Sequence, residues 1–279
     1  MNDLNYIYFQ GRKKCLTEKG KEKLIELYNA GLNYVSIGKE MGVGEEVMTR
    51  WAKELQLTDR RRKYHFNENY FANINSKEKA YWLGFLSADG CVNQERQYVY
   101  LELQEGDFQH IEKFRLALQS YDQQTKPIQN NGFLHYRFTA FSKTLVQDLA
   151  KYNIVQNKSL VFSPPTNIST DLLPYWIIGY MDGDGCVYLA KGRLKINFIG
   201  TNETCKFLKE YFNSNNTISQ AHNCQNNTYS FTLEVELSEA FLKQYNYDNL
   251  DFALERKKQI YASFIQQWIK VRERIAGKP

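Results

Sequence analysis

The chain has 279 residues, of which 43% are hydrophobic and 24% are charged. This composition excludes wholesale disorder. No apolar run is long enough to predict a membrane span. Five scattered cysteines without a Cys-x-x-Cys pair favour neither a disulfide framework nor a zinc cluster, and a polar start without an apolar signal core favours a cytoplasmic location. The formal net charge is +5, and residues 1–65 carry 13 Lys and Arg against 9 Asp and Glu.

Residues 1–58 predict a small all-α helix-turn-helix domain. Three short helices are expected within residues 17–57, with Thr17 capping the first and Gly42 turning the chain between the second and the third. The third helix would lie in the major groove of DNA, where its outward residues Thr49, Arg50 and Lys53 would make contacts. A helical bundle without a DNA role is the alternative.

Residues 59–75 predict a basic linker between two domains. The run Arg60, Arg61, Arg62 and Lys63 can bind phosphates of a nucleic acid. The alternative is a solvated linker without a ligand.

A sequence motif recurs 95 residues further along the chain. The matching residues of the first copy are Gly84, Asp89, Gly90, Cys91 and Val92, and those of the second are Gly179, Asp184, Gly185, Cys186 and Val187. Each copy predicts a helix that ends in Asp-Gly, and similar strands and helices follow each one. We therefore expect two αββαββα halves, residues 76–165 and residues 166–279.

The two motif helices are expected to pack against each other. Gly84 and Ala88 are four residues apart, as are Gly179 and Gly183, and small residues at this spacing let two helices approach closely. Each helix then places an aspartate at the negative end of its dipole, and two adjacent carboxylates also repel each other. A bound Mg²⁺, completed by water and phosphate oxygens, would offset both penalties.

The segments Trp82–Gly90 and Ile177–Gly185 resemble the paired motifs of monomeric LAGLIDADG homing endonucleases, over roughly residues 66–270. The resemblance implies an α+β fold in which two pseudo-symmetric halves form a β-saddle. It implies that Asp89 and Asp184 are catalytic and hold two or three Mg²⁺ ions, helped by the carbonyls of Ala88 and Gly183. The first acidic position of the motif is Ser87 in one copy and Asp182 in the other, which we interpret as a tolerated departure.

The resemblance implies further site residues. A polar residue is expected at the end of the second strand of each half, where Gln104 matches but Gly200-Thr201 lacks the long amide. A basic residue is expected after the last helix of each half, and Lys158 and Lys257 match. A lysine near the scissile phosphate can stabilise developing charge. Outward side chains of the predicted strands would contact DNA: Tyr98, Tyr100, His135, Arg137, Arg193, Lys195 and Asn197.

These observations favour a monomeric DNA endonuclease. The resemblance implies that it is site-specific, binds a long target in double-stranded DNA, hydrolyses both strands with Mg²⁺ and leaves short 3′ overhangs. One alternative is an intron-splicing maturase, whose partner would be intron RNA. The other is a transcription regulator on the same fold that has lost cleavage, against which the two intact aspartates argue. No membrane partner is expected.

Overall fold

A computed structural model describes residues 6–30, 32, 34–57, 64–221 and 228–276, and its contacts divide the chain into two units, residues 1–64 and 65–279. Each unit has its own hydrophobic core. None of the helices in these ranges is long and apolar enough to cross a membrane. The basic run Arg60, Arg61, Arg62 and Lys63 lies outside the described residues.

The first unit contains three helices preceded by a β-hairpin. Its elements are β1 (Ile7–Gln10), β2 (Lys13–Leu16), α1 (Glu18–Asn29), α2 (Tyr34–Glu40) and α3 (Glu45–Glu54). Thr17 caps α1 by accepting a hydrogen bond from the amide of Gly20 at 3.1 Å, and Gly42 turns the chain after α2 with a φ of +68°. The expectation of an all-α domain is therefore wrong. Distant residues hold the hairpin, because the indole of Trp51 donates to the Lys14 carbonyl at 3.3 Å.

The second unit is α+β, with two halves that repeat one order of elements. The first half contains α4 (Lys77–Ala88), β3 (Cys91–Asn93), β4 (Tyr98–Gln104), α5 (Phe108–Ala117), β5 (Lys126–Asn130), β6 (Phe133–Phe141) and α6 (Lys143–Ala150). The second contains α7 (Leu173–Asp184), β7 (Cys186–Ala190), β8 (Arg193–Gly200), α8 (Asn202–Tyr211), β9 (Ile218–Gln220), β10 (Tyr229–Thr232) and α9 (Val235–Gln244), and α10 (Glu255–Ala276) follows. Each half forms an antiparallel four-stranded sheet, in the orders β3-β4-β6-β5 and β7-β8-β10-β9.

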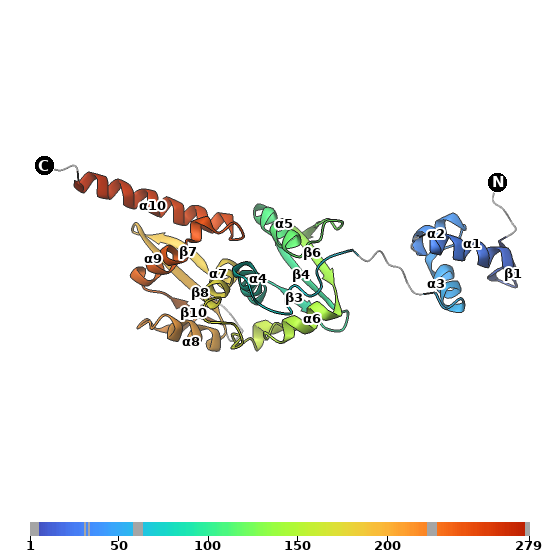
Figure 1. The fold of residues 1–279 in the computed structure, drawn as a ribbon, viewed down its shortest axis with the longest axis horizontal. Coiled ribbons are helices and arrows are strands. Elements are labelled where there is room, and N and C mark those ends of the chain that lie inside the picture. The colour runs from blue at the N-terminus through green and yellow to red at the C-terminus, as the bar shows by residue number, and fades with distance from the viewer. Residues whose placement is uncertain (1–5, 31, 33, 58–63, 222–227, 277–279) are drawn as a thin grey trace. The chain divides into compact units, whose positions relative to one another are not determined.

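Helices α4 and α7 lie side by side at the centre of the second unit, with one sheet on either side of the pair (Figure 1). A Cβ added to Gly84 would lie 2.0 Å from the carbonyl oxygen of Trp176, and one added to Gly179 would lie 1.9 Å from that of Tyr81. Only glycine fits at these two crossing points, so the predicted close packing of the motif helices is confirmed. Nearly every side of both helices is buried, which explains why their sequences are apolar all round.

The central strands β4 and β8 alternate between a buried face and an open face, as their sequences predict. In β8, Leu194, Ile196 and Phe198 are fully buried, while the residues between them face the other side of the sheet. β5 and β6 are joined through Asn131 and Gly132, which both have positive φ, as a tight hairpin turn requires. The residues on the open faces of both sheets are thus available for a ligand.

The segment before α4 differs from the predicted linker. Tyr70 and Phe71 are buried in the core of the second unit, and the amide of Asn67 donates to the carbonyl of Leu118 at 2.7 Å. The later part of residues 59–75 therefore packs as part of the second unit. Its two aromatic residues are the signal in the sequence that could have indicated this.

Candidate active site

The two motif aspartates stand at the ends of the paired helices. Asp89 caps the C-terminus of α4, and Asp184 is the last residue of α7. Each is followed by a glycine whose added Cβ would collide with the preceding turn, 2.6 Å from the Leu86 oxygen at Gly90 and 2.5 Å from the Met181 oxygen at Gly185. The Asp-Gly pair therefore lets the chain leave each helix tightly and keeps one carboxylate at each helix end.

The surroundings of both aspartates disfavour their negative charge. Burial raises the pKa of Asp89, and the Lys158 and Lys257 ammonium groups counter part of this rise. Burial and the negative charge of Asp89 together raise the pKa of Asp184 to about 6. Asp184 is closely surrounded by the rest of the chain, but the residue still reaches the surface, and Asp89 is half-buried, so a cation could reach both. A cation between them would relieve the mutual repulsion.

Two buried lysines bind the C-terminal carbonyls of the motif helices. The Lys158 ammonium donates to the Ala88 oxygen at 2.6 Å, and Lys158 is only 7% exposed. The Lys257 ammonium donates to the oxygens of Met181 at 2.6 Å, Asp182 at 2.8 Å and Gly185 at 2.6 Å. Burial lowers the pKa of both lysines, while nearby aspartates raise it.

The two lysines are not equivalent. An ammonium has three protons to donate, and Lys257 uses all three on α7 and the glycine after it. Lys158 makes one such bond within the residues that the structure describes. Lys158 can therefore still donate to a substrate, whereas Lys257 holds the end of α7 in place. The recurrence in the sequence located both lysines but did not distinguish these roles.

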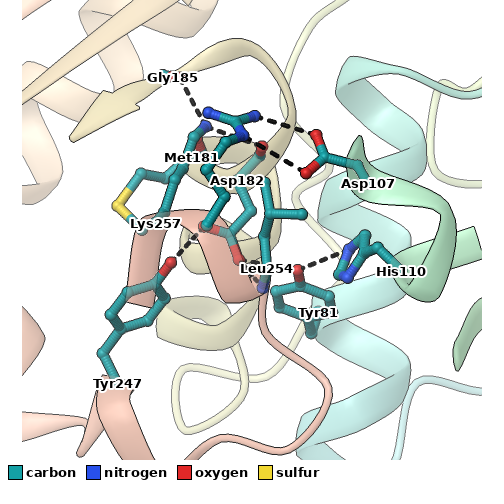
Figure 2. A network of polar contacts seen from close by, with 10 residues as sticks. Tyr81, Asp107, His110, Met181, Asp182, Gly185, Tyr247, Leu254 and Lys257 are labelled. Carbon is teal, nitrogen blue, oxygen red and sulfur yellow. Dashed lines mark hydrogen bonds and ion pairs between the residues drawn. The ribbon is translucent and has the colours of Figure 1, made fainter. Parts of the chain in front are cut away.

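Asp182 belongs to a buried hydrogen-bond network and is not part of the open site. Figure 2 shows its carboxylate between Tyr247 and Tyr81, whose hydroxyls donate to it at 2.6 and 2.8 Å, and the amide of Leu254 donates at 2.8 Å. Burial raises the pKa of Asp182, and these hydrogen bonds and the positive charge of Lys257 counter the rise. The ring nitrogen Nε2 of His110 lies 3.0 Å from the Tyr81 hydroxyl. Sequence reasoning treated this position as tolerant and missed its structural role.

Ser87, the matching residue of the first half, makes fewer hydrogen bonds than Asp182. Its hydroxyl donates to the Leu83 oxygen at 2.8 Å and accepts from the indole of Trp176 at 3.2 Å. A serine fits here because one indole donor needs one acceptor, whereas three donors converge on Asp182.

A cavity of about 190 Å³ adjoins Asp184, and its walls include Lys158, Tyr180, Gly200 and Thr201. The Tyr180 hydroxyl donates to the Ile199 oxygen at 2.9 Å, and a Cβ on Gly200 would lie 2.3 Å from that hydroxyl. The Tyr180 hydroxyl fills the space beside Gly200, which explains why the second half has no long amide side chain at this position. Gln104 of the first half is exposed at the end of β4, and no described hydrogen bond joins it to either aspartate.

On the open face of the first sheet, three of the predicted DNA-contacting residues gather around one acid. The Arg137 guanidinium pairs with Glu102 and lies 4.3 Å from the centre of the Tyr100 ring, and His135 Nδ1 lies 3.4 Å from the Glu102 carboxylate. Tyr98 neighbours Tyr100 on the same strand, with ring centres 6.2 Å apart. Sequence reasoning did not anticipate that Glu102 neutralises part of this face.

On the second sheet, two of the residues predicted to contact DNA already have partners within the protein. Arg193 is paired with Glu236 and Glu239 of α9 at 3.0 and 3.3 Å, so these two carboxylates would compete with a phosphate for its exposed guanidinium. The acidic start of α9 lies close to the first residue of β8 and attracts it. Asn197 accepts hydrogen bonds from Ser230 and Thr232 at 2.8 and 2.9 Å. Lys195 lies between Arg193 and Asn197 on the same face of β8 and is half-buried.

In the first unit, α3 presents Thr49 and Lys53 to solvent, as predicted. Arg50 is half-buried, and its guanidinium donates to the Lys14 oxygen at 2.6 Å. Arg50 therefore anchors the hairpin that the sequence did not predict, which limits its reach toward a ligand.

The donor set at the helix ends fits a magnesium ion that is shared with a substrate. The described residues contain no cluster of three or more His, Cys, Asp or Glu that could hold a metal. At the helix ends, the candidate ligands are the carboxylates of Asp89 and Asp184 and nearby carbonyls. The Ala88 carbonyl already accepts from Lys158, and the Gly183 carbonyl belongs to the last turn of α7. Mg²⁺ is commonly bound by one or two carboxylates together with water and substrate phosphates.

No family model and no curated protein matches the chain. Among solved structures, the chain is similar to the LAGLIDADG meganuclease I-AabMI bound to uncleaved DNA, with 17% identity, a TM-score of 0.45 and coverage of 70% of this chain and 91% of that one. It is similar to the LAGLIDADG homing endonuclease I-GzeII in complex with its DNA target, with 12% identity, a TM-score of 0.46 and coverage of 74% and 94%. It is also similar to I-SmaMI bound to uncleaved DNA in the presence of calcium ions, with 12% identity, a TM-score of 0.42 and coverage of 74% and 95%.

Proposed function

We propose that this protein is a site-specific endonuclease that hydrolyses both strands of a long target in duplex DNA. The observation that carries the proposal is the pair Asp89 and Asp184, which end two helices in backbone contact and whose pKa values are both raised. One acid from each pseudo-symmetric half suits a substrate with two scissile phosphates, one on each strand. The motif resemblance supports the same activity.

Asp89 and Asp184 would hold Mg²⁺ between the helix ends and the DNA. When bound, the ion would stabilise negative charge on the phosphate and make a water molecule more acidic. The Lys158 ammonium would donate a hydrogen bond to a phosphate oxygen, which stabilises the negative charge that develops there. Lys257 and the Asp182 network would keep the end of α7, and with it Asp184, in position.

The open faces of the two sheets would contact the duplex. Tyr100, His135 and Arg137 on the first sheet, and Lys195 and Asn197 on the second, are side-chain types that read base edges or bind phosphates. The first unit would add a second DNA contact, and the covalent link between the units would raise the affinity of the whole chain.

The proposal is tested with purified protein on a library of duplexes, with Mg²⁺ or with a chelator, followed by sequencing of any ends. Mg²⁺-dependent breaks at one site, with paired ends offset to leave short 3′ overhangs, are the expected result. Enrichment of one duplex sequence without any cleavage would instead favour a transcription regulator. Tighter binding to structured intron RNA than to any duplex would favour a maturase.

A further inference from the structure

Among the described residues of the first unit, the excess of positive charge lies on the hairpin, whereas the run Arg60, Arg61, Arg62 and Lys63 lies outside those residues. Residues 7–16 carry three basic residues and no acidic one, whereas residues 17–57 carry six basic and seven acidic residues. Glu45 and Glu46 lie in the first turn of α3 and offset the charges of Arg50 and Lys53. Because a polyanion is attracted to local positive potential, it would be drawn to the hairpin before α3.

The hairpin is held firmly on α3. The Lys14 carbonyl on β2 accepts from the Arg50 guanidinium at 2.6 Å and from the Trp51 indole at 3.3 Å. Leu16 at the base of the hairpin is buried in the core of the unit, and the amide of Thr17 donates to the Tyr6 oxygen at 3.0 Å. An isolated two-stranded hairpin is only marginally stable, so these contacts give the hairpin its fixed place.

The outer end of the hairpin is open. Gly11 makes the turn with a φ of +61°, and Arg12 and Lys13 beside it are exposed. Phe9 on β1 is 64% exposed, so the described part of the first unit does not cover this surface. The Lys13 ammonium lies 3.6 Å from the Glu54 carboxylate. An exposed pair of this kind is weak, and a phosphate can replace the carboxylate as the partner.

We propose that the hairpin Ile7–Leu16 is a nucleic-acid contact of the first unit that binds the phosphate backbone of duplex DNA through Arg12, Lys13 and Lys14. The hairpin contacts α3 through Arg50 and Trp51. The inference rests on the proposed function only in naming duplex DNA as the ligand. It concerns binding by the first unit and not cleavage by the second.

The test measures the affinity of the full chain for a fluorescent duplex at several salt concentrations, by anisotropy. All proteins carry Asp89→Asn and Asp184→Asn, so that the duplex stays intact. The combined variant Arg12→Gln, Lys13→Gln and Lys14→Gln should bind about tenfold more weakly. The slope of log affinity against log salt concentration should become less negative by about two to three. A matched control removes three charges elsewhere in the same unit, with Lys19→Gln, Lys23→Gln and Lys39→Gln, and should stay within about twofold.

A further variant makes the test independent of folding. Glu54→Gln removes the carboxylate beside Lys13, at 3.6 Å, and Arg50, at 3.9 Å. It should tighten binding about twofold, which an unfolded protein could not do. Weaker or unchanged binding by this variant would contradict the role of Lys13.

Equal losses in the hairpin variant and the control variant would overturn the proposal, because they would indicate attraction to net charge alone. A loss that is confined to structured RNA would overturn the assignment of duplex DNA. Selective loss of duplex binding in the hairpin variant would support the inference even if the unsubstituted chain cut no DNA. Unchanged binding by the hairpin variant of a chain that cuts DNA would reject the inference and leave the endonuclease proposal intact.

Discussion

The hydroxyl of Tyr81 on α4 donates a hydrogen bond to the carboxylate of Asp182 on α7, at 2.8 Å. The residue at the matching place on α7 is Trp176, which donates to Ser87 on α4 at 3.2 Å. Each helix thus contributes one donor and one acceptor across the pair. The two bonds flank the glycine contacts that bring the helices together, and they fix the position of the helix ends that carry the two aspartates.

Asp182 should matter more for stability than its counterpart Ser87. Asp182→Ala removes the acceptor of three buried donors, from Tyr81, Tyr247 and Leu254. Tyr81 keeps His110 as a partner, but the loss of the other two pairs should still lower the free energy of unfolding by about 3–5 kcal/mol. Ser87→Ala leaves only the indole of Trp176 unpaired and should cost about 1–2 kcal/mol. Urea unfolding of both variants checks this order, and equal losses would contradict it.

The close approach of α4 and α7 predicts that neither crossing glycine tolerates a methyl group. Gly84→Ala would place a Cβ 2.0 Å from a backbone oxygen, and forcing the helices apart should cost about 3 kcal/mol or more. Gly106→Ala is the matched control, because its Cβ would meet no atom within 4 Å, and it should stay within about 0.5 kcal/mol. Thermal unfolding measures both, and a stable Gly84→Ala variant would argue against backbone contact between the helices.

The different bonding of the two lysines predicts different consequences of their removal. Lys257→Met removes three hydrogen bonds to carbonyls at the end of α7 and should lower the free energy of unfolding by about 3 kcal/mol. Lys158→Met breaks one described bond and should cost about 1–2 kcal/mol, yet it should abolish most of the cleavage. Measurement of stability and cleavage on the same samples separates the roles. Similar stability losses would show that the lysines are equivalent.

Much of this arrangement could be predicted from the repeated motif. The spacing of Gly84 and Gly179 from their aspartates indicates which faces pack and where both carboxylates lie, because helix geometry alone sets these relationships. The bonding of Lys257 could not be predicted, because it depends on how α10 begins beside the end of α7. The hairpin at Ile7–Leu16 was missed for a similar reason, because Arg50 and Trp51 stabilise it from a distant part of the sequence.

The raised pKa of Asp184 predicts how the metal-free protein responds to pH. The folded state holds this proton up to a pH of about 6, whereas the ordinary value is 3.8. The folded state therefore binds more protons than the unfolded state in this interval, and the contribution of Asp184 to stability falls as the pH rises through it. Urea unfolding with a chelator should show this fall as a difference between the unsubstituted protein and Asp184→Asn. Asp171→Asn, at an exposed position, should not change the pH profile.

Mg²⁺ should restore stability above this interval by binding the ionised carboxylates. A pH profile that Asp184→Asn leaves unchanged would contradict the proposed environment of Asp184.

The central claim is that Asp89 and Asp184 together perform the cleavage. The most direct measurement compares the unsubstituted chain with the double variant Asp89→Asn and Asp184→Asn, on one duplex target, for both cleavage and binding. The account predicts that the double variant loses Mg²⁺-dependent cleavage of both strands and still binds the duplex at least as tightly, because two repelling carboxylates near the phosphates have been neutralised. Unchanged cleavage by the double variant would show that the active site lies elsewhere.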